Sequence, residues 1–377
     1  MAQEQMANVN GNRSGHLVTR RTFVMQLAGM GLAAGSLLSG CAQKPTSDPV
    51  DSVSANGEFE QVPSDQTESY SGEAIQQATT SSESAAELHD KHVARIVLIS
   101  DMHIDASFEP SIGHAQAAFA ALTQFDPAPD VIVINGDIAN HGLSEEFDLA
   151  ESLAADAGLQ FPTSFICAMG NHEQRGYYDE ASPEAFAAQR ELFMQRCGLE
   201  RLYYDVEVNG IHIAVLGPDA DPLSWKTIRL SNEQLEWLDD LLEADAQEER
   251  LTFVFSHQPI NDTVIHTYEG EYAHDALESS DALHDVVAKY PHAVVVTAHT
   301  HSPADFFLPN EDGPLYVADS AVAYLRHDPY VDWTDEGVNY SCGVLADVFG
   351  DRVEFLSWDF VQNTEDDAGG FTLEASF

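Results

Sequence analysis

The sequence predicts an α/β fold, and three features of residues 95–360 support this prediction. Short apolar runs alternate with segments of helical periodicity, as expected for strands that are buried on both faces. No internal repeat of solenoid length is visible. Five of the apolar runs end in Asp, Asn or His, so we expect these side chains to share one edge of the sheet.

The first part of this region contains three strand–helix pairs. The run RIVLIS precedes a helix near 115–125, DVIVING precedes a helix near 145–157, and SFICAMG precedes a helix near 183–196. Pro183 falls in the first turn of the third helix, where the missing N–H of proline costs no hydrogen bond. Each apolar run is therefore expected to form a buried strand.

The second part adds a hairpin, two helices and further strands. YYDVEVNGIHIAVLG is typical of a hairpin that turns at Asn209 and Gly210. LSNEQLEWLDDLLEADA predicts an amphipathic helix, because four leucines fall on one side. LTFVFSH and AVVVTAH flank a helix near 282–289. The meander strands expected after them are FFLP, PLYVAD, GVLADVFG and DRVEFLSWDF.

The first 90 residues have a different composition. Residues 1–40 contain the pair Arg20–Arg21 and a Gly- and Ala-rich apolar stretch too short to span a bilayer. This segment resembles a twin-arginine export signal. The sequence from Leu38 to Cys41 resembles a bacterial lipobox, which implies cleavage before Cys41 and lipidation of its sulfur. Residues 41–90 are polar and acidic, and we expect them to form a disordered tether.

These patterns give four expected segments. The signal covers 1–40, the lipidated tether 41–90, the folded domain 91–362, and a C-terminal tail 363–377. The chain is then expected to be extracytoplasmic and held to the bacterial membrane through its lipid alone. With Cys41 lipidated, three cysteines are left, and the sequence does not decide whether two of them form a disulfide. They are Cys167, Cys197 and Cys342.

The charge of the chain is strongly negative. It has 16 Lys and Arg against 63 Asp and Glu, which gives a net charge of −47. Such a surface repels nucleic acids and anionic lipid headgroups. We therefore expect a small substrate and no nucleic-acid partner, and the sequence leaves the oligomeric state open.

The run LISDMHID raises the question of metal binding. In an extended chain Asp101 and His103 point to the same side, and carboxylate and imidazole groups both bind divalent metals. Alone, this pair also fits an Asp101 that caps a following turn and a His103 that lies on the surface. Asp, Asn or His also follows the ends of four further apolar runs, which makes a shared metal site the better interpretation. The residues delivered there are Asp137, Asn171, His172, His257, His299 and His301.

The residue types indicate the chemistry. Nitrogen and oxygen ligands without cysteine argue against a structural zinc site. Seven ligands from this set, which leaves out His172, are too many for one ion but suit two ions that share a carboxylate. Two divalent ions (Mn, Fe, Zn or similar) can hold a bridging hydroxide that attacks a phosphoryl group in line.

The ordered motifs D-M-H, G-D-I-A-N, G-N-H-E, S-H and A-H-T-H resemble the calcineurin-like metallophosphoesterase superfamily over residues 95–360. The resemblance implies a four-layer α/β/β/α sandwich with mixed sheets and a metal site at the carboxyl ends of strands. It also implies that Asp101, His103 and His301 bind a first ion, and that Asn171, His257 and His299 bind a second. Asp137 would bridge the two ions, and His172 would stay off the metals and act as proton donor. Ala298 stands where the family usually has glycine.

The resemblance implies a phosphoesterase, and small phosphodiesters are the expected substrates. A phosphomonoesterase or nucleotidase of the same superfamily is one alternative, and a non-catalytic surface lipoprotein with a relic fold is another. Candidate substrate contacts are Asn140, His141 and Arg175, and Arg326 is a second arginine near the motifs. His141 fits a loop position equally well, and Arg175 fits a surface salt bridge.

Overall fold

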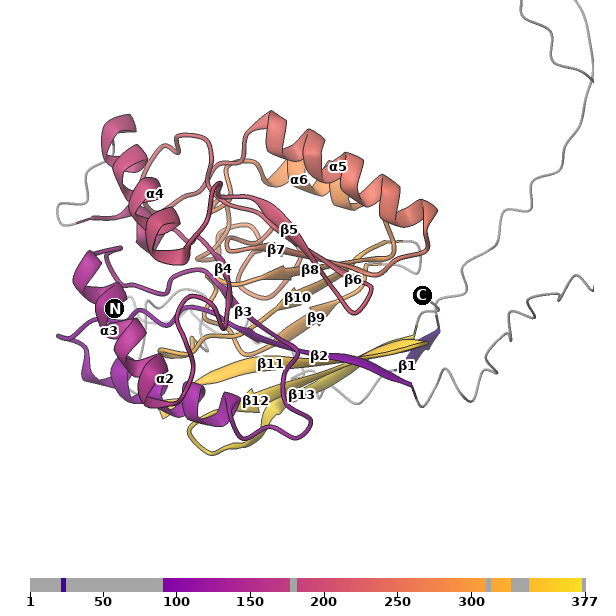
Figure 1. Cartoon of the computed structure of the whole chain (residues 1–377). Coiled ribbons are helices and arrows are strands. Elements are labelled where there is room, and N and C mark those ends of the chain that lie inside the picture. The colour runs from indigo at the N-terminus through magenta and orange to yellow at the C-terminus, as the bar shows by residue number, and fades with distance from the viewer. Residues whose placement is uncertain (1–21, 25–90, 177–181, 310–312, 327–338, 375–377) are drawn as a thin grey trace, which may run out of the picture. The chain divides into compact units, whose positions relative to one another are not determined.

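Two mixed β-sheets form the middle of the fold, and helices lie outside them (Figure 1). The computed structural model describes residues 22–24, 91–176, 182–309, 313–326 and 339–374. The first sheet contains β1 (Thr22–Val24), β2 (His92–Ile99), β3 (Val131–Asn135), β4 (Ile166–Ala168), β11 (Cys342–Phe349), β12 (Arg352–Asp359) and β13 (Thr364–Glu374). The second contains β5 (Tyr204–Val208), β6 (Ile211–Val215), β7 (Thr252–Ser256), β8 (Ala293–Thr297), β9 (Asp305–Phe307) and β10 (Leu315–Ala318).

The helices occupy the connections between strands. They are α2 (Glu109–Leu122), α3 (Ser144–Asp156), α4 (Pro183–Cys197), α5 (Asn232–Gln247), α6 (Ser280–Val287) and the 3₁₀ helix η1 (His172–Gln174). The strand order is β1-β13-β12-β11-β2-β3-β4 in the first sheet and β5-β6-β7-β8-β10-β9 in the second. The strand–helix alternation and the hairpin at Asn209 and Gly210 are therefore confirmed.

Three apolar cores separate four layers of structure. Val97 of β2 packs with residues of α2 and α3, whereas its neighbours Ile96 and Leu98 pack against the second sheet. Val254 of β7 packs with residues of α5 and α6 on the far side of that sheet. Successive strand residues point to opposite faces, so strands between two cores must be apolar throughout. This arrangement confirms the expected α/β/β/α sandwich.

Parallel strands set the direction of the loops that matter for function. β2, β3 and β4 are parallel neighbours in the first sheet. β6, β7 and β8 are parallel neighbours in the second. Each crossover contains a helix, as parallel pairing requires. The loops that leave the carboxyl ends of these strands carry the Asp, Asn and His residues of the sequence motifs.

The prediction of a C-terminal tail at 363–377 is wrong for residues 364–374. Residues 364–374 form β13, which pairs antiparallel with β12, and Phe371 and Leu373 are buried. The acidic start of this segment and the pair Gly369–Gly370 interrupt the alternation by which a strand is recognised in sequence. The domain therefore extends beyond residue 362.

Much of the N-terminal segment lies outside the described residues, including Cys41, the expected tether up to residue 90 and most of the expected signal. Within the signal, Thr22–Val24 pairs in parallel with β13. No helix in the described part of the chain is long and apolar enough to span a bilayer. Cys167, Cys197 and Cys342 are buried free thiols.

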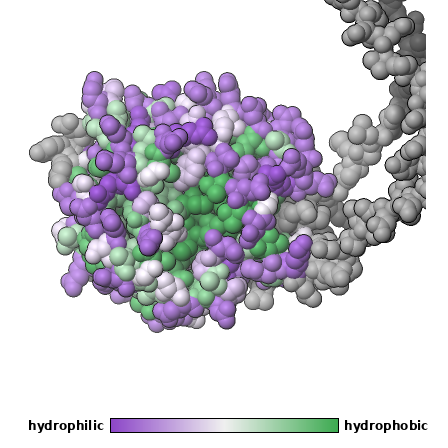
Figure 2. Space-filling view, viewed as in Figure 1, coloured by the Kyte–Doolittle hydropathy of each residue, from purple (hydrophilic) through white to green (hydrophobic). Residues whose placement is uncertain are grey.

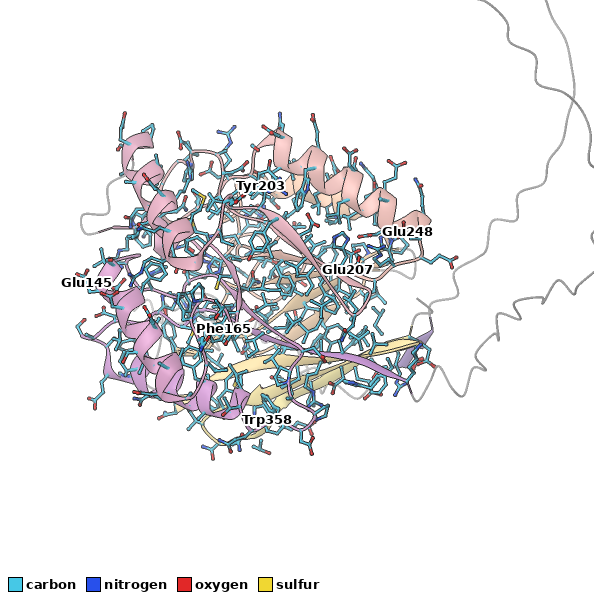
Figure 3. The ribbon with its side chains drawn as sticks, in the orientation of Figure 1. Glu145, Phe165, Tyr203, Glu207, Glu248 and Trp358 are labelled. Atoms are coloured by element: carbon cyan, nitrogen blue, oxygen red, sulfur yellow. The ribbon has the colours of Figure 1, made fainter. Side chains whose placement is uncertain are left out.

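The outer surface of the helical layers is polar. Hydrophilic residues gather around the rim of the face shown in Figure 2, and apolar residues lie near its centre. Glu145, Glu207 and Glu248 are exposed, and Glu145 and Glu248 lie at opposite edges of the molecule in Figure 3. Most acidic residues in the described part of the chain are not buried; the buried ones include Asp101, Asp137 and Glu173 at the site described next, and Asp245 of α5 away from it.

Candidate metal centre

The carboxyl ends of five strands converge on one point between the two sheets. β2 leads to Asp101 and His103, β3 to Asp137, and β4 to Asn171 and His172. β7 leads to His257, and β8 leads to His299 and His301. All of these side chains are buried except that of His172, which is half-buried. The structure thus brings together residues that are up to 200 positions apart.

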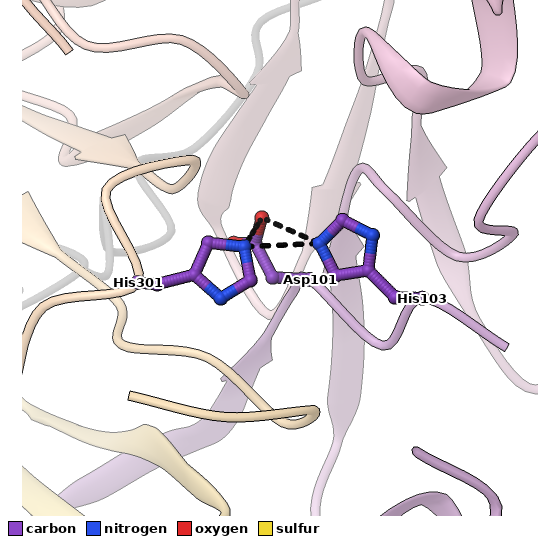
Figure 4. A group of neighbouring side chains, drawn as sticks. All are labelled: Asp101, His103 and His301. Carbon is purple, nitrogen blue, oxygen red and sulfur yellow. Dashed lines mark hydrogen bonds and ion pairs between the residues drawn. The ribbon is translucent and has the colours of Figure 1, made fainter. Parts of the chain in front are cut away.

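A first group consists of Asp101, His103 and His301 (Figure 4). The Nε2 atoms of His103 and His301 are 2.9 Å apart. Oδ1 of Asp101 lies 3.2 Å from Nε2 of His301 and 3.7 Å from Nε2 of His103. Three ligand atoms therefore face one small volume, as a single divalent ion requires.

A second group consists of Asp137, His257 and His299, whose ligand atoms lie within 4.8 Å of one another. Oδ2 of Asp137 is 3.1 Å from Nε2 of His257 and 3.8 Å from Nε2 of His103, which belongs to the first group. Oδ1 of Asp137 accepts a hydrogen bond from the backbone N–H of His172. One oxygen of Asp137 is thus fixed by the protein, and the other faces both groups.

Hydrogen bonds to carbonyl groups orient the imidazoles. Nδ1 of His257 is 2.7 Å from the carbonyl oxygen of Asn135, and Nδ1 of His301 is 3.0 Å from that of Tyr324. A carbonyl only accepts, so in each ring Nδ1 carries the proton. In the neutral ring the lone pair is then on Nε2, which faces the carboxylates. Metal-binding histidines in proteins are held in this way.

Asn171 is buried in the loop that follows β4. Its Oδ1 accepts a hydrogen bond of 2.8 Å from Nε2 of Gln258, the residue after His257. An amide oxygen has two lone pairs, so this bond orients the group and leaves one lone pair for an ion.

Electrostatics favour cations at this site. Burial would raise the pKa of Asp101, but the facing histidines hold it well below its usual range. Burial would lower the pKa of His257, but the carboxylates of Asp137 and Asp101 raise it to about 10. Oδ1 of Asp101 and Nε2 of His257 are buried without a hydrogen-bond partner among the described residues. The field that attracts a proton to these atoms also attracts a divalent cation, and the ligand atoms lie close enough together to hold one.

The turns that hold the ligands have unusual backbone conformations. Asp101, His103, Asp137, His299 and His301 all have positive φ angles, between 43° and 66°. The left-handed region is uncommon for residues other than glycine, and it is found at functional sites. Ala298, in place of the usual glycine, has no positive φ and is buried. Its methyl group therefore causes no backbone strain, and the departure from the family pattern removes no ligand.

Sequence analysis missed the role of Glu173, the last residue of the G-N-H-E motif. Its carboxylate accepts hydrogen bonds from the backbone N–H groups of Asp137, Ala139 and Gly170, at 2.8–3.0 Å. Burial and the nearby charge of Asp137 raise the pKa of Glu173 to about 7. Glu173 fixes the two turns that carry Asp137 and Asn171. The position of Glu173 directly after His172 in the G-N-H-E motif was the sequence signal that could have indicated this role.

The candidate substrate contacts lie at the margin of the site. The side chain of Asn140 donates to Asp105 at 3.0 Å, and Nδ1 of His141 is 2.7 Å from Glu146. Both side chains therefore contact carboxylates outside the two groups of ligands. Arg175 lies over the ring of Trp225, with its Cζ 4.7 Å from the ring centroid.

Comparison with known proteins agrees with this geometry. A family model described as calcineurin-like phosphoesterase matches residues 94–303. A dimetal phosphatase from Danio rerio is 12% identical with a TM-score of 0.52, covering 76% of this chain and 100% of that chain. The purple acid phosphatase PPD1 from yellow lupin (Lupinus luteus) is 14% identical with a TM-score of 0.54, covering 75% of this chain and 54% of that chain. Comparison with curated proteins found no match. The two solved structures establish the fold.

Asp137→Asn is expected to lower metal content and activity more than His299→Ala, because Asp137 faces both groups of ligands and His299 only one. The measurement is metal content per chain by mass spectrometry, together with the hydrolysis rate. Asp281→Asn, an exposed carboxylate at the start of α6, is the matched control. An Asp137→Asn protein that binds two ions as tightly as the wild type would refute the shared position.

Proposed function

This chain belongs to the calcineurin-like phosphoesterase family, and we propose that its substrates are small phosphodiesters. As a metallophosphoesterase it hydrolyses phosphoester bonds and uses two divalent metal ions. When bound, such ions lower the pKa of water and offset the negative charge of a phosphoryl group. The protein's own residues must then hold the ions, position the ester and protonate the leaving group.

His172 is the residue that we assign to the leaving group. Its Nδ1 is 2.7 Å from the carbonyl oxygen of Asn140. Its ring meets that of His103 edge-on, with centroids 4.3 Å apart. Burial lowers the pKa of His172 to about 3, although Asp137 opposes this effect. An anionic phosphoryl group beside the ring would favour the imidazolium, which can then donate its Nε2 proton to a departing alkoxide.

The observation that favours a small diester is the acidic balance of the chain, with a net charge of −47. A polyanion gains affinity by neutralising many phosphates with Lys and Arg, and only 16 such residues occur in 377. A diester carries less charge than a monoester and is repelled less by the acidic surface. Nucleic acids are therefore poor substrates in this proposal, and phosphomonoesters are the main alternative.

We also propose that the protein is exported and attached to the membrane through a lipid on Cys41. The support is the order of Arg20–Arg21, the apolar stretch and Leu38–Cys41 in the sequence. One acyl chain binds a membrane only marginally, whereas two or more give stable attachment. Outside the cytoplasm, a tethered hydrolase would meet small phosphoesters that diffuse to it.

His172→Ala is expected to retain both metal ions while its turnover falls by roughly 10²–10⁴-fold, the range for acid–base catalysis. Metal analysis and steady-state kinetics on the same sample check this expectation. His284→Ala, at an exposed position of α6, is the control. Loss of metal from the His172→Ala protein would instead place His172 among the ligands.

Substrate class is tested by competition at low ionic strength between a chromogenic phosphodiester, the matching monoester and a single-stranded oligonucleotide. The diester is expected to have the highest kcat/KM, because it carries the least negative charge of the three substrates. A higher kcat/KM for the monoester would identify a phosphomonoesterase. Efficient cleavage of the oligonucleotide, weakened by added salt, would reveal a basic groove and contradict the proposal.

Cys41→Ala is expected to remain unprocessed and without lipid when the full chain is expressed in a bacterium with twin-arginine export. Mass spectrometry of the membrane fraction identifies the mature N-terminus and its acyl groups. Recovery of wild-type protein that is soluble and cleaved at another position would contradict the assignment of Cys41.

A further inference from the structure

A second buried carboxyl group, that of Asp319, is connected to the candidate ligand Asp101 through the side chain of Ser100. Asp319 follows β10 of the second sheet, and its backbone N–H donates a 2.9 Å hydrogen bond to the carbonyl oxygen of Thr297 in β8. Ser100 follows β2 of the first sheet. Both Ser100 and Asp319 are completely buried. Their contact therefore joins the two sheets next to the first group of ligands.

The Oγ atom of Ser100 lies between the two carboxyl groups. It is 2.8 Å from Oδ2 of Asp101 and 2.8 Å from Oδ1 of Asp319. The carbonyl oxygen of Ser320 lies 3.2 Å from it. A serine hydroxyl has one hydrogen to donate, so it cannot give a full hydrogen bond to both carboxyl groups. Because two acceptor oxygens at this distance repel unless a hydrogen lies between them, one of the carboxyl groups must donate to Oγ.

The proton belongs to Asp319. Oδ1 of Asp101 faces the imidazoles of His301 and His103, and they favour its ionised form. Asp319 makes no ion pair with a described residue, and an ionised carboxylate removed from water is unfavourable without one. Burial and the charge of Asp101 raise the pKa of Asp319 well above its usual range, although hydrogen bonds with Ser100 and Asn135 oppose them.

We propose that Asp319 is a neutral carboxylic acid that positions Asp101 for the first ion by acting through Ser100. The carboxyl O–H of Asp319 donates to Oγ of Ser100, and the hydroxyl of Ser100 donates to Oδ2 of Asp101. The backbone N–H of His299 donates to the same oxygen at 3.0 Å. Oδ2 is thus held by the protein, and Oδ1 is left for the ion. The proposal rests on the metal centre of the proposed function and is independent of the choice of substrate.

A purely structural contact between the sheets would stabilise the fold without affecting ion affinity. The two roles differ in what the side chain at position 319 must supply. An asparagine amide donates N–H to Ser100 as the acid donates O–H. A leucine of similar size donates nothing, so the hydroxyl of Ser100 is free to turn toward the carbonyl oxygen of Ser320. Positioning therefore predicts that Asp319→Asn is tolerated and Asp319→Leu is not.

The test is the affinity of the metal-free full chain for Zn²⁺, measured by competition with a chromogenic chelator. Asp319→Leu is expected to weaken one of the two ions about 10-fold, and Ser100→Ala about 10- to 100-fold, the range for groups that orient metal ligands. Asp319→Asn should keep wild-type affinity. Adding Asp319→Leu to Ser100→Ala should cause no further loss, because the two residues act as one unit.

Asp245→Leu is the matched control. Asp245 is also a buried carboxyl group, and it contacts His212 and Thr252 away from the site. Its loss is expected to lower the melting temperature and leave both ion affinities unchanged. Anomalous diffraction from Asp319→Leu crystals at a limiting Zn²⁺ concentration should show that the weakened position is the one beside Asp101.

Wild-type affinity in Asp319→Leu would overturn the proposal. An equal loss in Asp319→Asn would also overturn it, since a negative charge would then be what matters, as would an equal loss in Asp245→Leu. If Asp319→Leu fails to fold, Ser100→Ala and Asp319→Asn decide, and wild-type affinity in Ser100→Ala is the contradicting result. None of these measurements involves a substrate, so failure of the preference for diesters is distinguished from failure of the role of Asp319.

Discussion

Two buried carboxylates, Asp101 and Asp137, are the feature on which the rest of the site depends. Both are essentially inaccessible to solvent, and an ionised carboxylate removed from water is unfavourable unless positive charge compensates it. Imidazoles at 3.1–3.8 Å supply part of this compensation. Divalent ions supply it more completely, because both carboxylates point an oxygen at the histidine nitrogens. The chemistry of the site thus follows from the need to neutralise two negative charges inside the protein.

The sheets hold these groups in a geometry that the local chain would not adopt alone. Five of the proposed ligands have left-handed backbone conformations, each of which costs roughly 1–3 kcal/mol in general. Hydrogen bonds from three backbone N–H groups to the carboxylate of Glu173 stabilise the turns that carry Asp137 and Asn171. The apolar cores on both faces of each sheet fix the strand ends from which the turns start. The folded sheets therefore hold the ligands in position before an ion binds, and such preorganisation is how metal sites gain affinity and selectivity.

The sequence was sufficient for the fold class and for the meeting of the candidate ligands at one edge of the sheets, because both depend on local patterns, whereas the division of the ligands into two groups was implied by the family resemblance. An apolar run that ends in Asp or His shows where a strand stops and what it presents at the edge of the sheet. Other features depend on distant contacts that no local pattern encodes. The strand β13 was hidden by acidic residues and Gly369–Gly370, and the stacking of Arg326 on Tyr272 joins residues 54 positions apart.

The central claim is that two divalent ions bind side by side and share Asp137. Anomalous diffraction from crystals of the protein loaded with Mn²⁺ or Zn²⁺ tests it most directly. Two peaks about 3.5–4 Å apart are expected, as in other two-metal sites. One peak should adjoin Asp101, His103 and His301, the other should adjoin His257 and His299, and Asp137 should contact both. A single peak, or two peaks of which only one contacts Asp137, would contradict the shared carboxylate and the binuclear chemistry that depends on it.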